Sequence, residues 1–182
     1  MSKKRAIISV HDKTGVAAFA KELCKLGFEI VSTGGTARHL SESGIDVTEV
    51  SDVTGFPEVL DGRVKTLHPL IHAGILARRI PSHEEQLGQI GASWVDMVVI
   101  NLYPFQQTVD AGKDHETVIE NIDIGGPSMI RAACKNYERV AVVTSPDRYE
   151  GIVEELKKFG NITDETRFEL AREAFHHTAA YD

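Results

Sequence analysis

Ala6-Ile7-Ile8-Ser9-Val10-His11-Asp12-Lys13-Thr14-Gly15 is a short apolar run followed at once by a polar turn. An apolar, largely β-branched run of this length is typical of a strand that is buried on both faces. From Val16 to Leu26 the apolar residues recur at helical spacing, and Gly27 supplies the stop. This strand–turn–helix unit is the building block of a parallel α/β sheet.

The same alternation continues along the chain. Ser82-His83-Glu84-Glu85 has the spacing of a capping box and predicts the start of a short helix, and Asp147 is expected to cap a later one. Further strands are predicted over residues 28–31, 47–50, 96–100 and 139–144, and further helices over 37–43, 118–122, 127–136, around 152–156, and from 164 to 182. The sequence thus predicts an α/β fold: a three-layer sandwich with a central, mostly parallel sheet of about five strands.

Size and composition narrow the class of protein. A chain of 182 residues can form one ordinary hydrophobic core, so a single domain over residues 1–182 is predicted. The net charge of −7 disfavours nucleic-acid and membrane partners. Cys24 and Cys134 have neither disulfide nor metal-ligand spacing. The sequence also shows no secretory leader and no apolar run long enough to span a bilayer, so a cytoplasmic protein is expected. The last helix has no stop signal, so the chain is expected to end at a domain boundary.

Polar clusters follow several of the predicted strands. Residues 9–14 follow the first strand, residues 32–36 the second and residues 101–103 the fourth. Ligands of parallel α/β sheets bind beyond the carboxyl ends of the strands. We therefore expect these clusters to converge on one site.

Thr33-Gly34-Gly35-Thr36 resembles a phosphate cradle between a strand and a helix. Glycines let backbone N–H groups approach an anion, and the helix N-terminus adds positive potential. A plain turn accounts for four such residues equally well, and no P-loop or dinucleotide fingerprint is present. Lys13, Arg63 and Lys65 could complete a site for a phosphomonoester.

The long connection from Thr54 to Pro69 is expected to be structured but irregular, which is usual for functional loops. Its Gly62–Pro69 part presents Arg63 and Lys65, although a solvated basic turn is the alternative. His68 and His72 are four residues apart, but Pro69 intervenes and no Glu accompanies them, which argues against zinc. His68 is predicted to shape the loop.

Three further residues are candidates for proton transfer, namely Tyr103, Asp123 and Lys135. Gly125 and Gly126 follow Asp123 closely, so the backbone there can approach a ligand. The alternatives are that Asp123 is a helix N-cap and Lys135 a solvated cation at a helix end.

Seven blocks of sequence, in order, resemble one family. They include Ser-Val-x-Asp-Lys-Thr-Gly at 9–15, Gly-Arg-Val-Lys-Thr-Leu-His-Pro at 62–69 and Glu-Asn-Ile-Asp-Ile-Gly-Gly-Pro at 120–127, with the others at 32–36, 53–58, 72–76 and 101–105. The chain is similar to the N-terminal IMP cyclohydrolase domain of the bifunctional purine-biosynthesis enzymes of the PurH family. The resemblance implies a methylglyoxal-synthase-like sandwich, in agreement with the alternation of strands and helices.

The resemblance also implies a reaction, the closure of FAICAR, a formylated aminoimidazole carboxamide ribotide, to IMP with loss of water. Lys65 would stabilise the oxyanion, and Tyr103, Asp123 and Lys135 would move protons, with Asp123 as the base. No metal or redox cofactor is implied. The 5′-phosphate would be held by Lys13, Gly35, Thr36 and Arg63. The purine or ribose pocket would be lined by Thr33, Gly34, Thr66, Asn101 and Ile124, with further substrate contacts from Ser9, His11, Asp12, Ile100, Gly125 and Gly126.

Two departures from the family stand out. His11 occupies a position where the family often has Ser, which would make phosphate binding more sensitive to pH. The formyltransferase domain that normally follows is absent, so cyclisation and not formyl transfer is expected of this chain, together with the homodimeric state of the family. The alternatives are a methylglyoxal-synthase-type lyase and a non-catalytic, purine-nucleotide-binding regulatory module.

Overall fold

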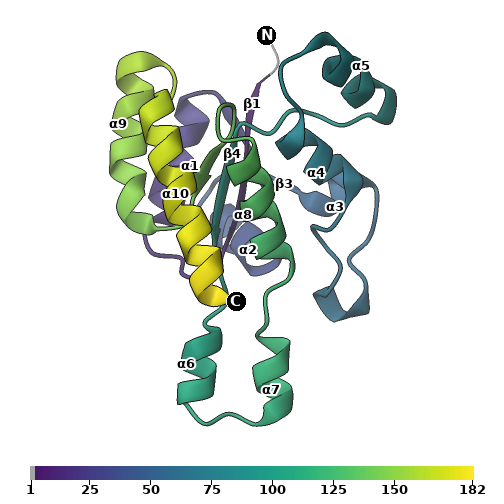
Figure 1. The fold of residues 1–182 in the computed structure, drawn as a ribbon, viewed down its shortest axis with the longest axis vertical. Helices are drawn as coiled ribbons and strands as arrows, with labels where there is room; N and C mark the ends of the chain where they lie inside the picture. Colours follow the sequence, from purple (N-terminus) through teal and green to yellow (C-terminus); the bar gives the residue numbers. More distant parts are fainter. Residues whose placement is uncertain (1–2) are drawn as a thin grey trace.

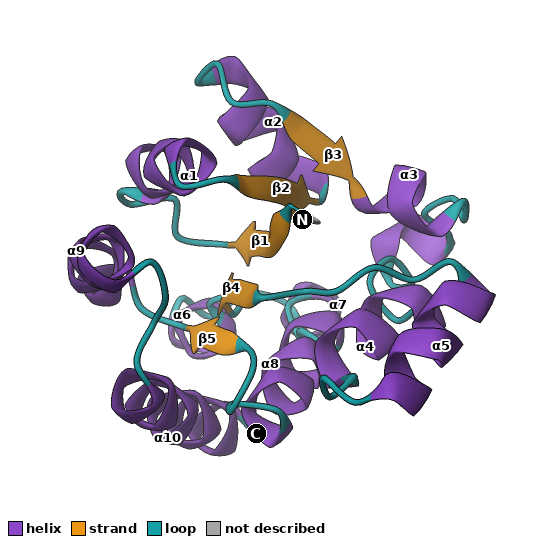
Figure 2. Ribbon diagram, turned by 90° about the horizontal axis from the view of Figure 1, so that it is seen from above, coloured by secondary structure: helices purple, strands orange, loops and turns teal. Residues whose placement is uncertain are grey.

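The computed structural model describes residues 3–182, which form a five-stranded sheet between layers of helices (Figures 1 and 2). All neighbouring strands are parallel, and their order is β3-β2-β1-β4-β5. The predicted α/β sandwich is confirmed. The strands are β1 (Lys4–Val10), β2 (Phe28–Ser32), β3 (Val47–Glu49), β4 (Met97–Asn101) and β5 (Ala141–Val143).

Both faces of the sheet are buried. Ile7 and Ile8 are neighbours on β1, point to opposite faces, and are both fully buried. One apolar cluster joins the sheet to α1, α2 and α9, and a second joins it to α4 and α8, while α10 contributes to both (Figure 2). The helices are α1 (Val16–Lys25), α2 (Gly34–Glu42), α3 (Val50–Thr54), α4 (Pro69–Leu76), α5 (Pro81–Ile90), α6 (Phe105–Asp110), α7 (His115–Glu120), α8 (Gly125–Lys135), α9 (Tyr149–Phe159) and α10 (Asp164–Tyr181), with 3-10 turns at Leu60–Gly62 and Pro146–Arg148.

Three helices were not predicted. Val50 was assigned to the third strand, but it opens α3, because its side chain is buried in the second apolar cluster and packing overrides its strand propensity. In α4 nearly every residue is apolar, so no amphipathic period marks it as a helix. The third, α6, is a six-residue helix, too short for a periodic signal.

Two predicted helix caps are wrong. Ser82 does not cap α5, which starts at Pro81 after Ile80, because proline is preorganised for the first helical position. Asp147 does not cap α9 either. Its backbone amide donates to Ser145, whose hydroxyl caps the preceding 3-10 turn (3.2 Å). In both cases the predicted cap has a suitable side chain but does not occupy the N-cap position. Ser82 follows Pro81, the first residue of α5, and Asp147 precedes Arg148, the N-cap of α9.

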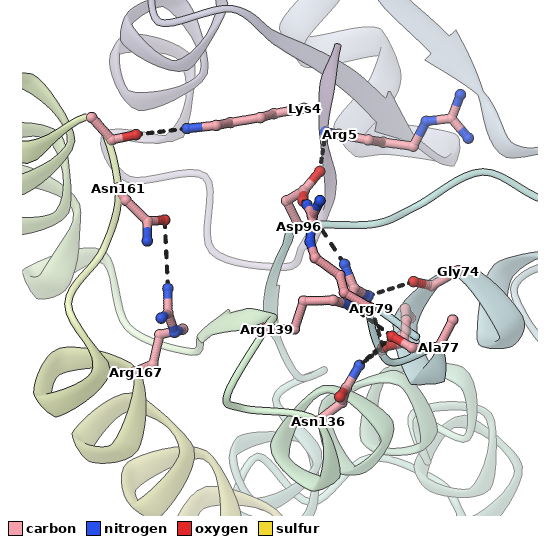
Figure 3. A network of polar contacts seen from close by, with 12 residues as sticks. Lys4, Arg5, Gly74, Ala77, Arg79, Asp96, Asn136, Arg139, Asn161 and Arg167 are labelled. Atoms are coloured by element: carbon pink, nitrogen blue, oxygen red, sulfur yellow. Dashed lines mark hydrogen bonds and ion pairs between the residues drawn. The ribbon is translucent and has the colours of Figure 1, made fainter. Parts of the chain in front are cut away.

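A partly buried polar network lies at the amino edge of the sheet (Figure 3). Asp96 accepts a hydrogen bond from the amide of Arg5 (2.9 Å). The guanidinium of Arg139 donates to the carbonyls of Ala77 (2.7 Å) and Gly74 (2.6 Å), and the amide of Asn136 also donates to Ala77 (2.9 Å). These bonds satisfy carbonyls at the C-terminal end of α4 and attach that helix to the body of the protein.

No helix within residues 3–182 combines the length and the apolar character that crossing a membrane requires.

Candidate functional site: a cleft at the carboxyl edge of the sheet

A cleft of about 570 Å³ lies at the carboxyl edge of the sheet, the edge beyond which α6 and α7 project (Figure 1). The strand order reverses between β1 and β4, and ligands of open α/β sheets bind at such a switch point. The volume is that of a small-molecule site. Its lining comes from the loops after β1, β2 and β4, from the Asp61–Thr66 segment, and from the ends of α7 and α8.

Asn101 joins the two loops that flank the switch point. Its side-chain oxygen accepts hydrogen bonds from the backbone amides of His11 (2.6 Å) and Asp12 (2.9 Å), and its amide donates back to the carbonyl of Asp12 (3.1 Å). The loop after β1 is therefore held against the end of β4. Much of the bonding capacity of Asn101 is used within the protein, so its main effect is to shape the cleft.

The N-terminus of α2 opens into the same cleft. The amides of Gly34 and Gly35 have no acceptor among residues 3–182, and Thr33 gives no side-chain cap. The hydroxyl of Thr36 is buried, where it donates to the carbonyl of Val10 (2.9 Å) and accepts from its amide (3.1 Å). An anion here would be held by backbone N–H groups, with Thr36 tying α2 to β1.

Lys13 brings a positive charge to the end of β1. Its ammonium group donates to the carbonyls of Val10 and His11 (3.3 Å to His11). Burial lowers the pKa of Lys13, and the nearby carboxylate of Asp12 acts in the opposite direction. A partly desolvated cation of this kind binds an anion more strongly than one in water.

A strained hairpin, residues 58–65, forms another wall. An antiparallel bridge between Val59 and Val64 closes it. At its tip Leu60, Asp61 and Gly62 all have positive φ, of 57°, 54° and 92°. Such backbone is uncommon for residues with side chains and clusters at functional sites. The φ of 92° at Gly62 is one that residues with side chains rarely adopt, so this turn favours glycine.

The two cations of this hairpin are paired with carboxylates. Lys65 forms an ion pair with Glu58 (2.7 Å), and its Nζ would lie 3.2 Å from a Cβ atom on Gly34. Arg63 forms an ion pair with Glu120 on α7, and both side chains are at least half exposed, at 64% and 50%. Lys65 therefore lies beside the N-terminus of α2, whereas Arg63 reaches toward the opposite wall.

Asp123 lies at the start of α8. Its carboxylate accepts a hydrogen bond from the amide of Gly126 (2.8 Å), and its own amide donates to the hydroxyl of Tyr181 (2.8 Å). Burial raises the pKa of Asp123, while the backbone N–H groups of Gly126 and Tyr103 act against this rise. A Cβ atom on Gly126 would lie 2.7 Å from Oδ2 of Asp123. A side chain at residue 126 would therefore push the carboxylate away from the backbone amide to which it is bonded.

Most of the predicted site residues line the cleft. They are Ser9, His11, Lys13, Thr33, Gly34, Gly35, Thr36, Arg63, Lys65, Thr66, Asn101, Tyr103, Asp123, Ile124, Gly125 and Gly126. The structure brings these residues together from five separate segments of the chain, as expected for the carboxyl edge of a parallel sheet.

Three predicted site residues do not line the cleft. Ile100 is 1% exposed and belongs to the core, since it is an internal residue of β4. Asp12 is exposed, and its carboxylate accepts from the amide and hydroxyl of Thr14 (2.9 and 2.6 Å). Lys135 is exposed at the last residue of α8, roughly 15 Å along the helix from Gly125 at a rise of about 1.5 Å per residue.

Several cleft residues were missed, and the acidic ones are the most informative. Asp61 and Glu120 both line the cleft, although an anion site is expected to exclude carboxylates. Glu120 is the first residue of the 120–127 block, and its place in that block is the one signal that could have found it. His68 lies outside the lining and caps α4, where its Nδ1 accepts from the amide of Leu70 (3.2 Å), in line with its predicted loop-shaping role.

Among residues 3–182 no group of three or more His, Cys, Asp or Glu side chains is arranged to hold a metal ion.

Comparison with known proteins defines the class. Residues 15–128 match the model of the MGS-like domain family, and residues 133–182 match that of the AICARFT/IMPCHase bienzyme. The chain belongs to the MGS-like domain family. Within that family it corresponds to the MGS-like domain of the bifunctional purine biosynthesis protein PurH.

The relatives agree in both sequence and fold. PurH of Persephonella marina is 58% identical over 98% of this chain, and PurH of Cutibacterium acnes is 57% identical over 98%. The chain spans 35% of the length of each of these relatives. The crystal structure of ForH superposes with a TM-score of 0.86 at 34% identity, covering 100% of this chain and 96% of that one.

Proposed function

We propose that this cleft closes the second ring of FAICAR to give IMP and water. One observation carries the proposal. A single cleft combines an anion site, made of helix amides and lysine, with a half-buried carboxylate whose pKa is raised. The names of the PurH relatives and of the bienzyme family model support purine biosynthesis as the pathway of this reaction.

The 5′-phosphate is assigned to the N-terminus of α2. The amides of Gly34 and Gly35, which have no acceptor within residues 3–182, form with the partly desolvated Lys13 the kind of site that a phosphomonoester needs. Arg63 is assigned to the same anion once it leaves Glu120, because an exposed ion pair of this kind contributes about 1 kcal/mol or less.

Ring closure requires a base and a group that stabilises an oxyanion. The carboxamide nitrogen attacks the formyl carbon, forms the new C–N bond and gives a proton to Asp123, while the electron pair of the formyl C=O moves to oxygen. The ammonium group of Lys65 stabilises that oxygen. The formamide nitrogen then loses its proton as C=N forms, and the oxygen, having taken up two protons, departs as water.

Two residues complete the proton path. Tyr103 lines the cleft with a half-exposed phenol, and its hydroxyl can pass a proton to the departing oxygen. Lys135 has no part in the proposed path, because it lies at the far end of α8. Asp123 can act as a base only when it is ionised, and its pKa is raised. We therefore expect kcat to fall on acidification with an apparent pKa above the ordinary aspartate value of 3.8.

Absorbance spectroscopy tests the proposal directly. The 182-residue chain, folded by circular dichroism, is incubated with FAICAR, and the appearance of IMP is followed in the ultraviolet. Catalysed conversion supports the proposal, and binding of IMP without conversion would instead favour a regulatory module. Turnover of dihydroxyacetone phosphate with none of FAICAR would favour a lyase of the methylglyoxal-synthase type.

The expected homodimer and an attached formyltransferase unit are part of the same proposal. Light scattering on the purified chain tests the first of these.

A further inference from the structure

The last turn of α10 reaches the start of α8. The hydroxyl of Tyr181 accepts a hydrogen bond from the amide of Asp123 (2.8 Å) and donates one to the carbonyl of Asn121 (3.1 Å). Tyr181 belongs to the segment that matches the bienzyme model, whereas Asp123 belongs to the segment that matches the MGS-like model. A side chain from one segment therefore holds the backbone of the other at the cleft.

The position of this contact matters because the connection between α7 and α8 is short. Asn121 and Asp123 lie on either side of Ile122, so a single hydroxyl fixes the backbone at two points of this connection. The tyrosine ring is itself held, since it lies edge-on to Phe105 with 6.3 Å between ring centroids and packs against the second apolar cluster. A tyrosine held in this way places its hydroxyl at little cost in conformational entropy.

Asp123 is thus held from two directions. The amide of Gly126 on α8 orients the carboxylate, and Tyr181 on α10 orients the backbone that carries it. A Cβ atom on Gly126 would clash with Asp123 and Leu102, so the carboxylate has little room in which to move.

We propose that Tyr181 is a positioning residue for Asp123, an inference that rests on the proposed function. The phenol holds the base where the attacking nitrogen arrives, and it keeps water away from the two backbone groups that it bonds. The phosphate is held elsewhere, at the N-terminus of α2. Loss of the hydroxyl is therefore expected to act on kcat and to leave KM nearly unchanged.

The test compares Tyr181→Phe with Tyr137→Phe. Both changes remove one phenolic oxygen near α10, but the hydroxyl of Tyr137 has no hydrogen-bond partner among residues 3–182, and its ring packs against Phe168. Tyr181→Phe is expected to lower kcat about tenfold, with KM within about twofold, because small misplacements of a reacting group are costly. Tyr137→Phe is expected to leave both constants unchanged.

Two further measurements make the result decisive. Amide hydrogen exchange without substrate is expected to be faster at Asp123 in Tyr181→Phe and unchanged in Tyr137→Phe. In an Asp123→Asn background, Tyr181→Phe is expected to have no further effect on residual turnover, because the hydroxyl acts through the carboxylate.

The inference is overturned if Tyr181→Phe matches Tyr137→Phe in kcat, or if KM alone rises. Failure of the proposed function is distinguishable, since the wild-type chain would then not convert FAICAR, while exchange at Asp123 would still report whether the contact exists.

Discussion

Charged side chains gather at both edges of the sheet, but the two groups are bonded differently. At the amino edge, Arg139 is 8% exposed and donates to backbone carbonyls of α4 (Figure 3). At the carboxyl edge, Arg63 is 64% exposed and is paired only with the half-exposed Glu120 among residues 3–182. A buried charge bonded to backbone cannot be released without a large cost, whereas an exposed ion pair exchanges readily for another anion. The first arrangement stabilises the fold, and the second leaves cations available for a ligand.

The largest expected effect comes from Lys65→Met at the carboxyl edge. If Lys65 has the proposed role, removing its ammonium group takes away the stabilisation of the oxyanion and is expected to lower kcat by about 10²–10³-fold. The melting temperature is expected to stay near that of wild type, because the ion pair with Glu58 is partly exposed. Steady-state kinetics and a thermal scan measure the two effects.

Lys25→Met is the matched control, since Lys25 also forms an ion pair, with Glu22, but lies outside the cleft. A rise in KM with unchanged kcat in Lys65→Met would mean that Lys65 binds the phosphate and not the reacting oxygen, as its closeness to Gly34 also allows.

Arg139→Met at the amino edge is expected to show the opposite pattern. The free energy of unfolding should fall by about 2–4 kcal/mol, because several carbonyls of α4 and the carboxylate of Asp96 lose their buried partner. The kcat of the remaining folded protein should be unchanged. Urea unfolding and active-site-normalised kinetics are the measurements.

Arg79→Met serves as the control for Arg139. Its side chain is 68% exposed and pairs weakly with the same Asp96, so the change should cost less than about 1 kcal/mol. Equal losses in the two variants would contradict the distinction between buried and exposed cations.

Thr36→Val is expected to fall between the two patterns. The hydroxyl bonds to Val10, so its loss should lower the free energy of unfolding by about 1–2 kcal/mol. KM should rise only about a few-fold, because the amides of Gly34 and Gly35 remain in place to bind the phosphate. A large rise in KM with full stability would show that the hydroxyl contacts the phosphate instead.

The smallest effect on stability is expected from Glu120→Gln. Loss of the exposed pair with Arg63 should change the free energy of unfolding by less than about 0.5 kcal/mol. KM should fall, because a cation is released and a negative charge leaves the cleft, and this gain should shrink in high salt. Glu116→Gln, on the same helix but outside the lining, is the control, and a rise in KM for Glu120→Gln would show that this carboxylate helps to bind the substrate.

Local patterns predicted the framework of the site well. The apolar runs at 6–10 and 96–100 predicted β1 and β4, and the polar residues after them meet at one edge. Gly125 and Gly126 were expected to let the backbone approach a ligand, and in the structure the close neighbours at these positions are side chains of the protein itself, those of Thr66 and Asp123. These features follow from strand periodicity, chain order and the conformational freedom of glycine, which are properties of short segments.

Other features depend on partners far away in the chain. Thr36 was predicted to bind phosphate, but the packing of α2 on β1 turns its hydroxyl to Val10. Lys135 was predicted at the site, but the length of α8 carries it away. No local pattern distinguished Lys135 from the residues that line the cleft, or showed that the hydroxyl of Thr36, which does line it, bonds to Val10.

By itself, the sequence determined that the protein is a parallel α/β sandwich whose polar strand ends meet at one edge of the sheet, because alternating apolar patterns and strand-end glycines are local signals. Only the tertiary structure decided which charged side chains form exposed ion pairs and which are bonded to backbone in the interior. Arg63 pairs with Glu120 across 57 residues, and Tyr181 holds Asp123 across 58. The physical reason is that hydrogen bonds and ion pairs require partners within about 3–4 Å, and chain separation does not determine which groups come that close.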